Sequence, residues 1–423
     1  MATLTESQIA IVKATAPVLK EHGTAITTVF YDNMIRENPD LNNMFSTTSK
    51  TTGRQPRALA NAVLAYATYI DDLGKLTHAV ARIAHKHVSL QVTPEQYDIV
   101  GRYLIQAIGQ VLGDAATADI VDAWTTAYGV LANVFIGAEG QMYKKNAAEK
   151  WVGWRKFTIL RKVAESSSVT SFYLAPSDGA TPLPKFLPGQ YVSLQVPVPE
   201  LGYLQSRQYS LSEAPKEKRE YYRISVKKED GEEVGIPGLI SNMLHASFHE
   251  GDEVDLSHPQ GEFFVDPSDT SKEGVPVVLI SVGVGATPMM AILGSLVQDE
   301  GGAPPVKRPI SWIQASRSNE AKPFGKEVKR IVKENENVSA HVFLRKLGPN
   351  DRAGEDYHFG DMRLDLGKLD AQRDLHLGDG RTEYYICGPE VFMVEIRKVL
   401  VGLGVERDRI HLELFATGDV ADE

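Results

Sequence analysis

The hydrophobic periodicity changes twice along this 423-residue chain, and no other feature of the sequence constrains its fold as strongly. Residues 1–150 have a helical period, residues 151–268 alternate with a period of two, and residues 269–423 alternate between strand-like and helix-like segments. Each pattern needs a hydrophobic core of its own, and a chain of this length has room for about three domains. We therefore expect a multidomain protein with these three domains.

The first segment predicts an all-α domain. Thr5 and Thr93 each precede a glutamine by three positions, which is the capping-box pattern that starts a helix. Several helices with short connections are typical of an all-α fold. The expected helices run from Thr5 towards Gly23, from Ile26 to Arg36, from Thr93 to about Gly113 and from Ala115 to Asn146.

The second and third segments predict two kinds of sheet. Apolar and polar residues alternate at 192–196 and 222–226, which indicates an antiparallel sheet or barrel. The last segment alternates strands with helices, which is typical of a doubly wound parallel α/β domain. Its expected strands are Val277–Val282, Ile310–Ala315, Ala340–Leu344 and Tyr384–Cys387, and its expected helices are Met289–Val297, Lys326–Glu334 and Val391–Val401.

The composition excludes several classes of function. A net charge of -10, from 45 Lys and Arg against 55 Asp and Glu, argues against a nucleic-acid partner. Cys387 is the single cysteine, so an internal disulfide and a cysteine-based metal site are both excluded. The N-terminus lacks the apolar core of a signal peptide, and we expect a cytoplasmic protein.

One uncharged stretch is long enough to span a bilayer. From Val275 to Gln298 there is no Asp, Glu, Lys or Arg. Glycines and prolines interrupt its first half, however, so we expect a strand, a glycine turn and a buried helix there, with no membrane partner.

His87 lies on the apolar face of a predicted helix. Leu76, Val80, Ile83, His87 and Leu90 follow one another at spacings of four, three, four and three, which places them on one side of a helix. His87 is therefore expected to point inward, and the nearby His85 is expected to point to solvent. Taken alone, His87 is better explained by a buried histidine with a hydrogen-bond partner than by a metal ligand.

Two further patterns have both a functional and an ordinary explanation. Arg207 and Tyr209 share one face of a strand, where a guanidinium could bind a phosphate beside a flat ring, or form a common cross-strand pair. The glycines of 283–288 follow a buried strand and precede a helix, which suits a pyrophosphate but also a plain tight turn. Cys387, taken alone, has the ordinary explanation of a small buried hydrophobic residue.

The helical segment resembles the haem domain of the flavohaemoglobin family. The resemblance rests on Phe30-Tyr31, Phe45, Gln55 to Leu59 and Ile83 to His87, in this order. It implies that His87 is the proximal ligand of the haem iron. It also places Tyr31 and Gln55 on the distal side, with Phe45, Leu59 and Lys86 in the haem pocket, and Tyr97 and Glu139 in a hydrogen-bonded group with His87.

The remaining segments resemble the ferredoxin-reductase-type module of the same family. Arg207-Gln208-Tyr209-Ser210 resembles its flavin signature, and 238–244 resembles its pyrophosphate motif, with an apparent insertion at Gly235–Gly238. The resemblance implies that FAD is bound by Tyr191, Arg207, Gln208, Tyr209, Ser210, Ser241, Glu413 and Phe415.

The nicotinamide residues follow from the same resemblance. They are Gly283, Val284, Gly285, Ala286, Thr287 and Pro288, together with Cys387, Gly388 and Pro389. Ser316 and Arg317 follow a later strand, where an arginine could hold a 2′-phosphate or be surface charge. The choice between NADH and NADPH therefore stays open.

The resemblance covers essentially the whole chain and implies a nitric oxide dioxygenase. Electrons would pass from NADH or NADPH to FAD and then to haem b, and nitric oxide and O2 would give nitrate, with a monomer expected. Three alternatives stay open: a reductase of other acceptors, a gas-sensing or storage globin with its own reductase, and a reductase with a haem-free helical docking domain.

Overall fold

The computed structural model describes residues 3–46, 49, 52–231, 235–298 and 308–415. The described chain forms two compact units. One unit comprises residues up to Arg155 together with Ser193–Arg207, and the other comprises Lys156–Val192 and Gln208–Phe415.

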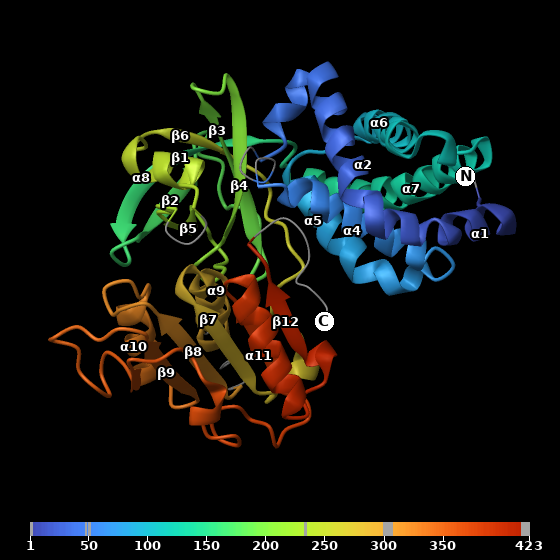
Figure 1. Cartoon of the computed structure of the whole chain (residues 1–423). Coiled ribbons are helices and arrows are strands. Elements are labelled where there is room, and N and C mark those ends of the chain that lie inside the picture. Colours follow the sequence, from blue (N-terminus) through green and yellow to red (C-terminus); the bar gives the residue numbers. More distant parts are fainter. Residues whose placement is uncertain (1–2, 47–48, 50–51, 232–234, 299–307, 416–423) are drawn as a thin grey trace. The chain divides into compact units, whose positions relative to one another are not determined.

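The first domain is all-α, as expected, and is the helical domain of the protein (Figure 1). Both capping boxes are confirmed, because the Thr5 hydroxyl accepts from the backbone of Gln8 at 3.2 Å and Thr93 forms the same motif with Gln96. These motifs satisfy backbone N–H groups that the first turn of a helix leaves unpaired. The helices are α1 (Glu6–Ala14), α2 (Ala16–Glu37), α4 (Arg54–Thr68), α5 (Thr77–Ser89), α6 (Pro94–Leu112) and α7 (Ala118–Ala148).

The expected helix boundary near Gly23 is wrong. The helix from Thr5 ends at Ala14, and α2 begins at Ala16 and continues through Gly23. Pro17 explains the new start, because proline is tolerated in the first turn and not in a helix interior. Gly23 has a packing role instead, since a Cβ there would lie 3.3 Å from the Cβ of Ala60 in α4.

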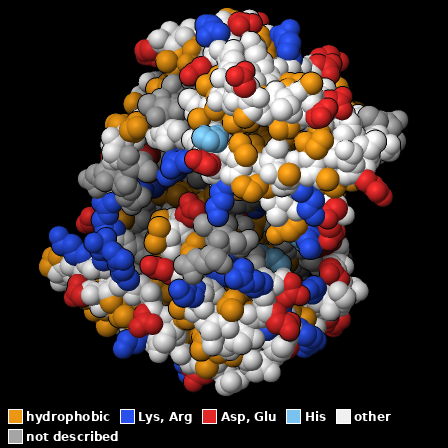
Figure 2. Space-filling view, turned by 45° about the vertical axis from the view of Figure 1, so that its right-hand side comes forward, with side chains coloured by type: hydrophobic (Ala, Val, Ile, Leu, Met, Phe, Trp, Pro, Cys, Tyr) orange, Lys and Arg blue, Asp and Glu red, His pale blue; other side chains and the backbone are white. Residues whose placement is uncertain are grey.

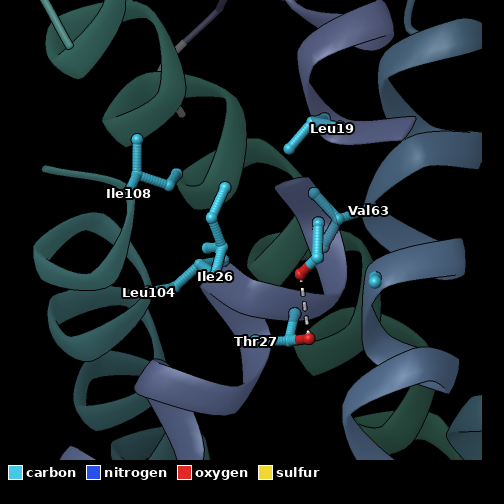
Figure 3. A pocket seen from close by; sticks show the side chains of 8 residues that line it. Leu19, Ile26, Thr27, Val63, Leu104 and Ile108 are labelled. Carbon is cyan, nitrogen blue, oxygen red and sulfur yellow. Dashed lines mark hydrogen bonds between the residues drawn. The ribbon is translucent and has the colours of Figure 1, made fainter. Parts of the chain in front are cut away.

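The close approach of α2 and α4 shapes the core of the helical domain. Figure 3 shows apolar side chains of α2, α4 and α6 converging beside Thr27, whose hydroxyl donates to the carbonyl of Gly23 at 3.0 Å. The same hydroxyl lies 2.8 Å from the carbonyl of Pro56, so α2 and α4 are also joined by a buried hydrogen bond. The converging side chains are Leu19, Ile26, Val63, Leu104 and Ile108.

The second domain is an antiparallel sheet of six strands in the order β4-β3-β6-β1-β2-β5. An antiparallel bridge joins Leu211, which follows β4, to Ile224 of β5, so the two edge strands meet and the sheet closes as a barrel. The expected barrel is thereby confirmed. Its strands are β1 (Arg155–Ala164), β2 (Val169–Pro176), β3 (Tyr191–Val198), β4 (Tyr203–Ser210), β5 (Tyr222–Lys227) and β6 (Glu253–Leu256), with helix α8 (Leu239–Ala246) before β6.

Polar residues on the second face of β3 and β5 are buried as well. The Ser193 hydroxyl donates to that of Ser89 at 2.8 Å within the helical unit. Arg223 is 5% exposed and its Nη1 lies 3.1 Å from a carboxylate oxygen of Glu327. Because other elements cover these positions, both faces of β3 and β5 are buried. The period-two alternation therefore separates apolar from polar buried surroundings, and not buried from exposed positions.

The third domain is the expected doubly wound α/β fold with a six-stranded parallel sheet in the order β10-β9-β8-β7-β11-β12. Helices α9 and α10 cover one face of the sheet and α11 covers the other. Two short strands, β10 and β12, were not predicted. The elements are β7 (Val277–Val282), α9 (Ala286–Val297), β8 (Ile310–Ser316), α10 (Gly325–Glu334), β9 (Val338–Leu344), β10 (Phe359–Gly360), β11 (Glu383–Cys387), α11 (Glu390–Gly402) and β12 (Ile410–Glu413).

The uncharged stretch from Val275 is β7, a glycine turn and the buried helix α9, as expected. Of the described helices, only α7 is long and apolar enough to cross a membrane by length and composition. In this structure α7 packs against α1, α5 and α6 and contributes Ala123, Trp124 and Ala127 to the helical core.

A buried ion pair offers a test of the α/β domain. Burial opposes ionisation of Glu383, but hydrogen bonds from Lys272 (2.8 Å) and Arg308 (2.9 Å) outweigh it and hold the pKa of this carboxyl below its usual value. Replacing Glu383 with Gln leaves Arg308, which is 5% exposed, without its carboxylate. We expect a loss of about 3–5 kcal/mol at neutral pH.

The sign of the pH dependence follows from the lowered pKa. The stabilisation is present above the unfolded pKa of about 4.5 and is lost as the pH falls through the folded value, so the difference between E383Q and the parent protein should shrink in acid. Amide hydrogen exchange in β11 measures this locally. The control E334Q breaks the exposed Arg330–Glu334 pair and should cost no more than about 0.5 kcal/mol. Equal losses in both variants would contradict the account.

Candidate functional site

Three helices bring His87, Tyr97 and Glu139 together. The Nδ1 of His87 on α5 lies 2.8 Å from Oε1 of Glu139 on α7 and 2.9 Å from the hydroxyl of Tyr97 on α6. The Tyr97 hydroxyl donates to the same Glu139 oxygen at 2.5 Å. Because the 2%-exposed carboxylate can only accept, Nδ1 carries the proton. The Nε2 lone pair is then available to a metal ion.

The buried carboxylate also controls Tyr97. Burial, followed by the hydrogen bond to Glu139 and its charge, raises the pKa of the Tyr97 phenol far above its usual value. The phenol therefore stays protonated and remains a donor to Glu139. This donation and that of Nδ1 satisfy the carboxylate, which would otherwise be costly to bury.

Sequence analysis missed two aromatic residues that support this group. The ring of Phe135 lies 5.7 Å from that of His87 and stacks at 6.3 Å on Tyr97. The Tyr128 hydroxyl donates to the carbonyl of Tyr97 at 2.6 Å. Its ring is close to Gly101, where a Cβ would lie 2.5 Å away. Phe135 precedes Glu139 by four positions, and that spacing is the signal that could have identified it.

Tyr31, Gln55 and Phe45 form a second group within the same unit. Gln55 Nε2 donates to the Tyr31 hydroxyl oxygen at 3.1 Å, so the phenolic proton is free to be donated elsewhere. Burial raises the pKa of Tyr31 to about 12, although the Gln55 hydrogen bond opposes this, and the phenol is neutral at physiological pH. Phe45 packs edge-on at 5.3 Å from Tyr31, and Leu59 packs on the same core.

The other residues of the haem motif on α5 are half-buried. His87 keeps 32% of its side chain exposed, and both His85 and Lys86 have intermediate exposure. His85, which was expected to point to solvent, is therefore only partly exposed. The spacing argument nevertheless identified the histidine that joins the buried hydrogen-bonded group.

Six of the eight predicted flavin residues lie on two strands and a helix of the barrel domain. Arg207, Gln208, Tyr209 and Ser210 end β4, and Tyr191 begins β3. Ser210 is 5% exposed, and its hydroxyl oxygen has no hydrogen-bond partner in the described chain. A buried hydroxyl without a partner is unusual and suits a ligand that supplies one. The donor set of β4 therefore fits a phosphate-bearing flavin.

The start of α8 provides a backbone cradle. A Cβ at Gly238 would overlap the hydroxyl of Ser241, which lies 3.4 Å from the Gly238 carbonyl. The backbone N–H of Gly238 donates to Glu229 at 2.8 Å. A side chain at Gly238 would therefore displace Ser241 or Glu229 at the N-terminus of α8, and the backbone N–H groups of a helix N-terminus favour anions. The apparent insertion at Gly235–Gly238 directly follows residues 232–234, which lie outside the described chain.

The glycine loop after β7 packs directly against the end of β11. A Cβ at Gly285 would overlap the carbonyl of Cys387, and Gly283 has a φ of +58° that favours glycine. Thr287 is buried and donates to the carbonyl of Val284 at 3.0 Å, which closes the turn before Pro288. The strand order reverses at β7, and dinucleotides bind at such a switch point.

The structure brings Glu413 but not Phe415 into a defined contact at this site. Glu413 of β12 is the register partner of Cys387. Burial, followed by the charge of Glu413, raises the pKa of the Cys387 thiol well above its usual value. The thiol therefore stays protonated and uncharged. Phe415 is 51% exposed.

Ser316 ends β8 and Arg317 directly follows it. The buried Ser316 hydroxyl has no hydrogen-bond partner in the described chain, and neither does that of Ser281 at the end of β7. Backbone hydrogen bonds join Ser316 to Arg345 at 3.0 Å and Arg317 to Lys346 at 2.9 Å. Basic residues therefore gather at the carboxyl ends of β8 and β9.

Comparisons with known proteins agree with this arrangement. The globin family model matches residues 28–135, and the oxidoreductase NAD-binding domain model matches residues 279–398. The flavohemoprotein of Bordetella pertussis is 46% identical over 414 residues, covering 97% of this chain and 98% of that protein. The chain belongs to the flavohemoprotein family.

Two crystal structures are also similar. The flavohemoglobin of Malassezia yamatoensis, with bound FAD and haem, has a TM-score of 0.81 and 30% identity, covering 98% of this chain and all of that one. The flavohem-like FAD/NAD-binding domain of nitric oxide dioxygenase from Vibrio cholerae has a TM-score of 0.51 and 36% identity, covering 61% of this chain and 97% of that one. This flavohemoprotein therefore has the all-α, antiparallel-sheet and parallel-sheet domains that its sequence predicted.

The Glu139 carboxylate can be tested separately from haem binding. Glu139→Gln keeps an oxygen acceptor 2.8 Å from Nδ1 but removes its charge, which weakens the hydrogen bond. We expect a lower Fe–His stretching frequency in the resonance Raman spectrum of the ferrous protein, with haem retained.

The matched control is Glu95→Gln, which changes an exposed acid in the first turn of the helix that carries Tyr97. It should leave that frequency unchanged. An unchanged frequency in E139Q would show that the carboxylate does not act on the imidazole.

Proposed function

We propose that this flavohemoprotein oxidises nitric oxide to nitrate, using O2 and NADH or NADPH. The observation that supports this most directly is the buried Glu139 carboxylate 2.8 Å from His87 Nδ1. A carboxylate on Nδ1–H makes the imidazole a stronger electron donor, which favours activation of oxygen over plain storage. A storage globin would have no use for this buried acid.

When bound, haem b supplies the iron at which oxygen and nitric oxide react, while FAD takes hydride from the nicotinamide and passes electrons on singly. His87 Nε2 would hold the iron, because Nδ1 is committed to Glu139 and Tyr97. Phe45, Leu59 and Lys86 complete the pocket as proposed haem contacts.

On the distal side, Tyr31 acts as a hydrogen-bond donor. Its phenol is protonated at all physiological pH values, since its pKa is raised to about 12. Gln55 Nε2 donates to the phenolic oxygen of Tyr31 at 3.1 Å. The O–H of Tyr31 is then left to donate to a bound substrate. Tyr31 is buried and Gln55 is partly buried, and the low local dielectric strengthens this donation.

In the reductase part, each proposed residue has one task. Arg207 binds phosphate, Tyr209 and Tyr191 cover the flavin ring, and Gln208 and Ser210 hydrogen-bond to it. Ser241 and the start of α8 bind the pyrophosphate of FAD, and Glu413 and Phe415 lie at the nicotinamide side of the flavin. Residues 283–288, Ser316, Arg317 and 387–389 hold NADH or NADPH.

We further propose that the domains span 1–150, 151–268 and 269–423, and that the protein is a cytoplasmic monomer without nucleic-acid or membrane partners. The single cysteine and the net charge of -10 support this. On the face shown in Figure 2, acidic and basic side chains are interspersed, and no broad basic surface is visible there.

The reaction is tested by its stoichiometry. With NADH or NADPH in air, the purified holoprotein should convert each nitric oxide to one nitrate and stop when O2 is exhausted. His87→Ala should lose haem and this activity while its flavin still reduces ferricyanide. Nicotinamide oxidation that is unaffected by nitric oxide, with no nitrate, would favour a reductase of other acceptors.

Tyr31→Phe tests the distal donor. Loss of a hydrogen bond to a charged group costs about 1.5–3 kcal/mol, so nitrate formation should slow by about 10- to 100-fold while haem content is unchanged. Dissociation of oxygen, measured by stopped flow, should accelerate by a similar factor. The control Tyr69→Phe, at a 38%-exposed tyrosine, should alter neither rate. Equal rates in both variants would remove Tyr31 from the mechanism.

A further inference from the structure

A cavity of about 200 Å³ lies in the α/β domain between α10, β9 and residues 354–358. It shares no residue with the proposed haem, flavin or nicotinamide sites. Pockets for drug-sized ligands usually measure about 300–1,000 Å³, so an occupant of this cavity would be small. Its apolar lining consists of Val328, Val332, Ala340 and Val342.

Lys322 is the unusual residue of this cavity. It is 6% exposed, and its ammonium donates to the carbonyl of Asp356 at 2.5 Å. Within the described chain no carboxylate forms an ion pair with it. Burial, followed by the charge of Lys329, lowers its pKa to about 8. A buried cation without a counter-ion is costly, and an ammonium has three protons to donate.

The charges of Asp356 and Asp351 favour the ammonium form of Lys322, but neither carboxylate forms an ion pair with it in the described chain. Lys329 is paired with the Asp356 carboxylate at 2.8 Å, and the lining acid Glu355 is paired with Arg352 at 2.6 Å. Lys333 adds a further positive charge at the rim. The lining therefore carries three lysines against one glutamate that is already engaged.

The remaining neighbours also favour an anion. The side-chain Nδ1 of His358 accepts from the backbone N–H of Val342 at 3.1 Å, and burial lowers the pKa of this histidine, so it is neutral at physiological pH. Gly325, the first residue of α10, packs against the Lys322 stem, where a Cβ would lie 3.0 Å from Cε. The positive end of the α10 dipole disfavours a cation there and favours an anion.

We propose that this cavity binds a small organic carboxylate, with its charged group on the Lys322 ammonium and its apolar part against Val328, Val332 and Val342. One buried ammonium matches one negative charge, whereas a phosphate dianion would need more donors than the lining offers. The apolar wall provides the remaining affinity by burying a ring or short chain. This site goes beyond the dioxygenase activity and does not depend on it.

Benzoate is the probe for this site, with benzyl alcohol as its neutral counterpart. Isothermal titration calorimetry on the full-length holoprotein compares the parent protein with Lys322→Met and with Lys326→Met, an exposed lysine on α10 outside the cavity. Benzoate should bind the parent and K326M equally and K322M at least tenfold more weakly, and benzyl alcohol should bind all three weakly. Saturating NAD⁺ should leave the benzoate affinity unchanged.

Several results would overturn the proposal. These are no benzoate binding to the parent at millimolar concentration, equal affinity in K322M, equal binding of benzyl alcohol, or displacement of benzoate by NAD⁺. If K322M is poorly folded by circular dichroism, Val332→Phe provides a second variant, because it fills the cavity from a half-buried position and keeps the ammonium. It should also abolish benzoate binding, and unchanged binding would contradict the site.

Discussion

The hydrogen bond between His87 Nδ1 and the buried Glu139 carboxylate is the interaction on which the proposed function of this flavohemoprotein depends. It joins α5 to α7, and the Tyr97 hydroxyl brings α6 to the same oxygen. A carboxylate buried this deeply must be satisfied by donors, so the three helices have one arrangement in which it is stable. That arrangement fixes the imidazole tautomer and leaves the Nε2 lone pair available to the iron that we propose His87 to bind.

A different constraint governs the reductase residues, which depend on close backbone contact. At Gly285 any side chain would overlap Cys387, so the loop after β7 and the end of β11 form one surface. Within the second unit, β5 is tied to the α/β domain by the Arg223–Glu327 pair at 3.1 Å, and Phe263 packs edge-on against Tyr385 at 5.4 Å.

The sequence predicted those parts of the molecule that local patterns determine. The capping boxes at Thr5 and Thr93, the strands of the parallel sheet and the inward-facing His87 all follow from spacing within one element. The prediction of a helix boundary near Gly23 was wrong because this glycine allows close packing against Ala60, which is distant in sequence. Tertiary contacts of this kind leave no periodic signal.

The same reason explains the residues that were missed. Phe135 looks like any core aromatic until α5 and α6 are placed beside it. Lys322 looks like a surface lysine in a polar loop, and only the packing of α10 and the segment around Asp356 buries it. Strands β10 and β12 are too short to show a period and form because a neighbouring parallel strand pairs with them.

An absorption spectrum of the purified holoprotein tests the central claim most directly. Under air, NADH should convert a ferric Soret band and flavin shoulder to an oxy spectrum, and nitric oxide should consume that spectrum as nitrate accumulates. A stable oxy spectrum that nitric oxide leaves untouched would contradict the proposed reaction. Flavin without a Soret band, even after haem supplementation, would contradict His87 as an iron ligand.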